Sequence, residues 1–172
     1  NSSNIRGQGK TCPLFLRNKY MAITTALCTS FKGELLGGTH DLDTHTLKMA
    51  LIKPSMSGTY DKTTANYSDV TGNSDEATGS NYSAGGNTLD SVTISTDASS
   101  GRAFVDIADE VFTNVTTSAR GCIIYNSSAS NKAIAVIDFG GTITATAGDL
   151  TVQFPAIGSG GATAIIRLDP PS

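Results

Sequence analysis

Hydrophobic residues near the start of this chain follow the period of a helix. They recur every four positions, at Ile23, Leu27, Phe31 and Leu35. Side chains at this spacing lie on one side of an α-helix. Gly37-Gly38 follows the run directly, and glycine commonly ends helices. We therefore expect one helix at about 24–36, with its apolar side packed on a sheet.

Most of the remaining chain alternates apolar and polar residues, which is the pattern of half-buried strands. Segments with this pattern lie at 46–53, 88–95, 102–107, 120–126, 132–139, 150–154 and 165–168. The segment 132–139 is apolar on both faces, so we place it centrally in a sheet. The turn-rich residues 126–131 predict that it forms a hairpin with 120–126. Gly140-Gly141 is interpreted as the turn that follows.

Seven or eight strands separated by turn residues are typical of an antiparallel β-sandwich or jelly roll. We predict a mainly β fold of this kind, with one N-terminal helix. Residues 21–172 would form a single domain, because a chain of 172 residues is ordinary for one domain.

A long polar loop at 54–87 interrupts the strand pattern. It is rich in Ser, Thr, Gly and Asn, and it holds three of the five tyrosines, Tyr60, Tyr67 and Tyr82. Tyrosine among small polar residues is the composition of adaptable binding loops, and long loops are often functional. The three tyrosines are therefore candidate interaction residues. The alternative is that they only anchor the loop to the sheet.

The first twenty residues differ from the rest in charge. They contain four basic residues and no acidic one, so the other 152 residues hold eight bases and fifteen acids. Met21 opens a stretch that looks like a protein start. We expect residues 1–20 to be translated leader or added sequence. The alternative is a basic arm that reaches the acidic surface of a neighbouring subunit.

Composition excludes several classes of partner. The whole chain has 12 basic and 15 acidic residues, which gives no basic field for nucleic acid. Its apolar runs are four or five residues long, far shorter than the roughly 20 residues of a membrane-spanning helix. We predict that the protein binds neither nucleic acid nor membrane.

The sequence shows no constellation that indicates catalysis. It has no Gly-x-Ser-x-Gly nucleophile motif and no complete phosphate-binding loop. His40 and His45 alternate with carboxylates, but we interpret this segment as a solvated connection rather than a metal site. We expect no catalytic residue, no cofactor and no metal.

The three cysteines have no metal-ligand spacing. Cys12 lies in the basic leader, and Cys28 and Cys122 read as small buried hydrophobic residues. An odd number of cysteines argues against a disulfide-built scaffold.

Several segments together carry a resemblance to a known group of proteins. They are Met21-Ala-Ile-Thr-Thr-Ala-Leu-Cys-Thr-Ser-Phe-Lys, the residues 119–141 from Ala-Arg-Gly-Cys-Ile-Ile-Tyr to Asp-Phe-Gly-Gly, and the residues 81–89, 150–156 and 164–168. The chain resembles small structural proteins of tailed bacteriophages, notably marine and cyanobacterial ones. The resemblance covers most of 21–168.

This resemblance implies a virion component that assembles in the host cytoplasm, such as a capsid decoration or cement protein or a tail-associated subunit. Its partners would be copies of itself and other virion proteins. Two alternatives stay open. One is a module that binds a host surface glycan through the 54–87 loop, and the other is a self-assembling surface or filament subunit unrelated to phage.

Arg120 is the fourth candidate interaction residue. It begins the best-patterned hairpin, next to a glycine. We expect it to pair with an acidic residue at a subunit or sheet boundary. The alternative is an ordinary solvated arginine.

Overall fold

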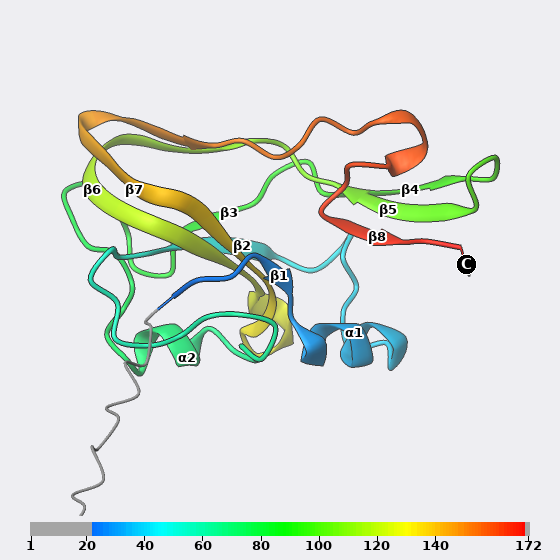
Figure 1. Cartoon of the computed structure of the whole chain (residues 1–172), viewed down its shortest axis with the longest axis horizontal. Helices are drawn as coiled ribbons and strands as arrows, with labels where there is room; N and C mark the ends of the chain where they lie inside the picture. The colour runs from blue at the N-terminus through cyan, green and yellow to red at the C-terminus, as the bar shows by residue number, and fades with distance from the viewer. Residues whose placement is uncertain (1–21, 171–172) are drawn as a thin grey trace, which may run out of the picture.

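The computed structural model describes residues 22–170 and confirms a mainly β fold with two antiparallel sheets and one N-terminal helix. The larger sheet has the strand order β1-β7-β6-β2-β3, and the smaller one has the order β4-β5-β8. Helices α1 and α2 both lie at the lower edge of the molecule in the view of Figure 1, apart from each other. The overall arrangement is sandwich-like.

The described residues form eight strands, two α-helices and two single-turn 3₁₀ helices. The strands are β1 (Ala26–Leu27), β2 (Leu47–Ile52), β3 (Asn87–Thr88), β4 (Thr93–Asp97), β5 (Arg102–Asp106), β6 (Glu110–Asn126), β7 (Lys132–Val152) and β8 (Ile166–Leu168). The helices are α1 (Thr29–Leu36), α2 (Ser68–Thr71), η1 (Ser127–Ala129) and η2 (Ser159–Gly161).

The hairpin of β6 and β7 is confirmed, and it is much longer than the sequence pattern predicts. The predicted turn at Gly140-Gly141 is wrong, because β7 runs through both glycines and ends at Val152. Gly140 has a φ of +75°, a conformation that glycine adopts at little cost. The register of the hairpin shifts at several points along its length. These bulges let the long ribbon curl back on itself, as Figure 1 shows.

The predicted helix begins five residues too early. Ala26 and Leu27 form strand β1 and pair with Val136 and Ala135 of β7. The backbone N–H of Cys28 also donates to the carbonyl of Ile134, at 2.9 Å. These tertiary hydrogen bonds override the four-residue period, so α1 starts only at Thr29.

The predicted strand at 88–95 is divided between the two sheets. Strand β3 pairs with β2 in the larger sheet, whereas β4 pairs with β5 in the smaller one. Between them Ser91 adopts a φ of +53°, a left-handed conformation that breaks an extended chain. The apolar residues Leu89, Val92 and Ile94 lie on both sides of this break, and the three-residue step from Leu89 to Val92 is its sign in the sequence.

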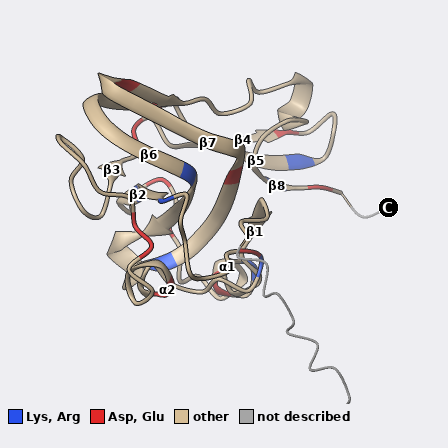
Figure 2. Cartoon of the chain, turned by 60° about the vertical axis from the view of Figure 1, so that its left-hand side comes forward, with Lys and Arg blue, Asp and Glu red and all other residues tan. Residues whose placement is uncertain are grey.

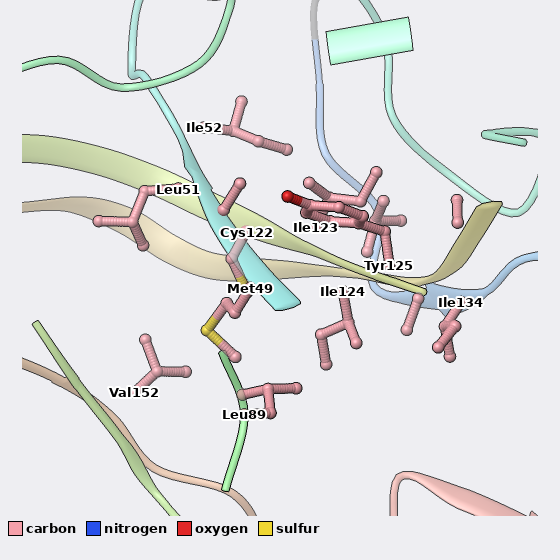
Figure 3. Close-up of a cluster of buried hydrophobic side chains, with 14 of the residues drawn as sticks. Met49, Leu51, Ile52, Leu89, Cys122, Ile123, Ile124, Tyr125, Ile134 and Val152 are labelled. Carbon is pink, nitrogen blue, oxygen red and sulfur yellow. The ribbon is translucent and has the colours of Figure 1, made fainter. Parts of the chain in front are cut away.

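The part of the larger sheet formed by β2, the end of β6 and the start of β7 is buried on both faces. Figure 3 shows Ile52, Ile123 and Tyr125 on one side of the sheet, and Met49 and Ile124 on the other. All five side chains are at most 2% exposed. This double burial explains why the sequence of β2 and of the end of β6 lacks strict alternation.

Candidate functional site

The three tyrosines of the long loop carry an internal hydrogen-bond network. Tyr60 is 1% exposed, and its hydroxyl donates to the carboxylate of Asp75 at 2.6 Å. That buried carboxylate also accepts the backbone N–H groups of Ser57 and Gly58, at 2.8 and 2.7 Å. Burial alone would raise the pKa of Asp75, but these hydrogen bonds outweigh it and hold the pKa below its usual value.

Glu76 organises the other two tyrosines. Its carboxylate accepts the hydroxyl of Tyr67, the hydroxyl of Tyr82 at 2.9 Å and the backbone N–H of Gly85 at 2.7 Å. The ring of Tyr67 stacks on Tyr125 of β6, with centroids 4.5 Å apart. The Tyr82 hydroxyl also accepts the N–H of Leu51 in β2, at 2.9 Å.

The loop 54–87 is therefore tied to the larger sheet through its tyrosines. Burial raises the pKa of Tyr60, Tyr67 and Tyr82 above the ordinary range, and the neighbouring carboxylates add to the effect. All three phenol groups are neutral donors committed to partners within the fold. This arrangement matches the anchoring alternative of the sequence analysis.

Arg120 pairs with an acidic residue inside the larger sheet. The register of β6 and β7 shifts between Ala119 and Gly121, and the extra residues of this bulge, 139–142, lie on β7 opposite Arg120. Its Nε lies 3.1 Å from one carboxylate oxygen of Asp138 in β7, and its Nη2 donates to the other oxygen at 3.2 Å. The two side chains form a bidentate, partly exposed pair between neighbouring strands.

Charged residues are thinly spread over the described part of the chain. In Figure 2 the Lys and Arg segments are few and lie on separate elements, with acidic segments between them. Several are paired locally, as Arg102 and Arg167 are with Asp169. Residues 22–170 therefore show no gathered basic field.

The smaller sheet presents one apolar surface. Directly paired residues of antiparallel strands lie on the same side of a sheet. The register places Ile94, Val105 and Ile166 in one row, and Thr96, Ala103 and Leu168 in the next. The opposite surface carries Phe104, which is covered so closely by Gly161 that a Cβ there would lie 2.2 Å from the ring.

Only the middle of this apolar surface is buried. Val105 and Ile166 are buried, whereas Ile94 is 51% exposed and Leu168 is 57% exposed. Leu36 of α1, which lines a second groove together with Leu168, is 86% exposed. A groove of about 160 Å³ runs between helix and sheet, lined by Leu35, Leu42, Ile94, Ala103, Phe104, Val105, Ile166, Arg167 and Leu168.

We call Leu35, Leu36, Ile94, Ala103 and Leu168 the apolar face. Single exposed hydrophobic residues are normal on protein surfaces, but large ones that adjoin one another mark contact sites. Strand β4 borders this face and is an edge of its sheet, with no paired strand on its outer side within the described residues. It contains no Lys or Pro of the kind that protects edges.

Two further grooves lie along β7. One, of about 410 Å³, is lined mainly by apolar side chains, including Ile137, Phe139 and Ile143. The other, of about 380 Å³, is lined mainly by hydroxyl side chains, including Thr116, Ser118 and Thr144. Ser118 and Thr144 are hydrogen-bonded to each other at 2.8 Å, so part of this polar lining is already satisfied.

Sequence reasoning did not identify the apolar face. Its members come from α1, β4, β5 and β8, which are brought together only by the tertiary fold. One signal was present in the sequence. Leu36 falls outside the four-residue period of the predicted helix, and an apolar residue on the polar side of a helix is a sign of surface contact.

His40, Cys28 and Cys122 are buried inside the fold. His40 is buried rather than solvated, contrary to the expectation for its segment, because Asn126 and Glu34 hold its ring. Cys28 and Cys122 are buried and free, as expected, and burial raises the pKa of Cys28 to about 12. Cys12 lies outside the described residues.

Among residues 22–170, no three His, Cys, Asp or Glu side chains are grouped so that they could hold a metal ion. No helix in the same part of the chain is both long enough and apolar enough to cross a membrane. Comparison of the chain with protein-family models, with curated proteins and with solved structures finds no match.

Proposed function

We propose that this chain is a non-enzymatic structural subunit of a tailed-phage particle, where it associates with copies of itself or with other virion proteins. The observation that carries this proposal is the apolar face, with Leu36, Ile94 and Leu168 all more than half exposed. An apolar surface of this kind is stabilised when a partner removes it from water. The resemblance described above supplies the phage context.

The edge of the smaller sheet suits the same role. An unprotected edge strand offers backbone N–H and C=O groups to a second strand, and side chains on its faces add selectivity. In β4 the exposed Ile94 would be covered by such a contact. In a symmetric assembly the same contact is repeated between many copies, so that contacts which are weak singly stabilise the assembly together.

The glycan-binding alternative lacks a specific supporting observation. It depends on tyrosines that are available to a ligand, and the hydroxyls of Tyr60, Tyr67 and Tyr82 are all committed within the fold.

Replacing both Ile94 and Leu168 by Asp should weaken self-association at least tenfold. Each carboxylate would have to be desolvated in the contact, and the apolar area lost from the contact would add to that cost. Sedimentation velocity over a range of concentrations measures the effect. The unmodified chain should form a dimer or larger species at micromolar concentration, and the double variant should be displaced toward monomer.

Val111→Asp is the matched control, since Val111 is also partly exposed, at 40%, but lies outside the apolar face. It should associate like the unmodified chain. If the unmodified chain is a monomer at every concentration, or if the control weakens association as much as the double variant does, the apolar face is not the contact surface.

A further inference from the structure

A cluster of four polar side chains joins helix α1, the connection that follows it and the turn between β6 and β7. At its centre is Asn126, the last residue of β6, which is completely buried. Its side-chain Nδ2 lies 3.0 Å from Nδ1 of His40 and 2.9 Å from Nδ1 of His45. On the far side of the His40 ring, Nε2 lies 3.0 Å from the carboxylate of Glu34 in α1.

The contacts of Asn126 point to one arrangement of hydrogens on both rings. Its side-chain oxygen accepts the backbone N–H of Ala129 at 3.1 Å, so its NH₂ group must be the part that faces the histidines. An NH₂ group only donates, and each Nδ1 must therefore accept. The structure assigns both rings to the neutral form with the hydrogen on Nε2, which lets His40 donate to Glu34.

A proton on either Nδ1 is incompatible with this arrangement. The new N–H would point at the N–H of Asn126, and two donors cannot bond to each other. Turning the amide over would place its NH₂ group against the N–H of Ala129 and would break the cap of η1. Since the His40 side chain is fully buried, water cannot take the place of the lost contact.

The charged groups near the two rings are Glu34 of α1, Lys132 of β7, and Asp41 and Asp43 of the connection. The carboxylates favour a protonated imidazole, whereas Lys132 disfavours it. Burial acts to raise the pKa of Glu34, but hydrogen bonds from Lys132 and His40 lower it overall. Glu34 is therefore charged throughout the range in which histidines titrate, and its own partner Lys132 offsets part of its attraction for an imidazolium.

We propose that His40, Asn126 and His45 form a pH-sensitive clamp, which is closed while both rings are neutral and opens when either ring takes up a proton. The clamp holds the connection that carries Leu42, whose buried side chain forms the floor of the groove beneath the apolar face. Opening it would loosen this floor and the end of α1. The clamp does not depend on the proposed assembly role, since its effect appears in the stability of a single subunit.

The sign of the effect follows from proton counting. Below about pH 6.5 an unfolded histidine binds a proton that the folded clamp excludes, so folding becomes less favourable as the pH falls. Between pH 7 and pH 5, the unfolding equilibrium constant should rise by up to about 25-fold for each ring, the full factor applying where the folded chain excludes the proton throughout this range.

Urea unfolding of the full chain at pH 7 and pH 5 tests the clamp. These are the only two histidines in the sequence, so no other imidazole contributes. The His40→Gln, His45→Gln double variant keeps an acceptor for Asn126 but cannot titrate. Between pH 7 and pH 5, its unfolding equilibrium constant should rise by a factor at least tenfold smaller than that of the unmodified chain. A rise of less than twofold in the unmodified chain, or an equal rise in the double variant, would overturn the proposal.

Asp43→Asn serves as the matched control. Its hydrogen bond to Asp41 and the repulsion between the two carboxylates raise the pKa of this exposed group, and the substitution removes its titration. Between pH 7 and pH 5, the unfolding equilibrium constant of this control should rise as much as that of the unmodified chain. Ring chemical shifts of the unmodified chain at pH 7.5 give a second readout that needs no variant. Both histidines should be in the Nε2–H form, and an Nδ1–H form of either ring would overturn the clamp.

Discussion

Val136→Asp should prevent this chain from folding at 25 °C. Val136 is completely buried in β7, where it pairs with Ile123 of β6 on one side and Ala26 of β1 on the other. A carboxylate placed there without a partner costs several kcal/mol. That cost is comparable with the whole stability of a typical domain, about 5–15 kcal/mol. Circular dichroism and the soluble fraction after expression measure the loss.

Two controls separate burial of a charge from other effects. Val136→Ala removes only methyl groups, and it should leave a folded protein that is destabilised by about 2 kcal/mol. Ile143→Asp places the same carboxylate on the same strand, at a position that is 41% exposed, and it should stay soluble and folded. A soluble and folded Val136→Asp protein would show that this part of β7 does not lie inside the sheet.

Asp75→Ala should destabilise the fold by about 3–5 kcal/mol, the usual cost of removing one partner from a buried charged network. The change leaves the hydroxyl of Tyr60 and the N–H groups of Ser57 and Gly58 without their acceptor. Each buried donor left unsatisfied costs about 1–3 kcal/mol. Urea unfolding at pH 7 measures the difference.

The same residue gives a pH dependence of known sign. Because the pKa of Asp75 is lower in the folded chain than its ordinary value of 3.8, its carboxylate stabilises the fold above that pH. This contribution disappears as the pH falls through the folded pKa. The difference in the free energy of unfolding between the unmodified chain and Asp75→Ala should therefore become smaller below about pH 4. Asp90→Ala, at an exposed carboxylate, should change stability little at any pH.

The sequence pattern was sufficient for the strands whose burial is regular. Alternation located β2 and β5 to within a residue or two, because their side chains face a core on at least one side. It also identified the hairpin of β6 and β7, whose connecting turn is rich in Asn and Ser.

The pattern was insufficient where backbone conformation or tertiary pairing decides the structure. The polar half of the β6–β7 hairpin lacks apolar alternation, and its pairing is maintained by backbone hydrogen bonds along two long strands. A left-handed Ser91 separates β3 from β4 within a segment that the sequence pattern predicts as one strand. The start of α1 depends on the contact of Ala26 with a strand more than a hundred residues later.

The candidate site, like the fold, could be predicted from the sequence only in part. Composition alone singled out the tyrosines of the 54–87 loop, but their roles depend on Asp75 and Glu76, which the sequence did not connect with them. The apolar face is assembled from four separate elements, and the clamp joins His40 and His45 to an asparagine more than eighty residues away. Such groupings follow from topology rather than from local pattern.

The central proposal is that this chain is a structural part of a tailed-phage particle. Quantitative mass spectrometry of particles purified from the host that produces the chain tests it most directly, with the copy number measured against the major capsid protein. We predict many copies per particle, at a fixed ratio set by the symmetry of the capsid or tail. Purified, infectious particles that contain none of the chain would contradict the proposal.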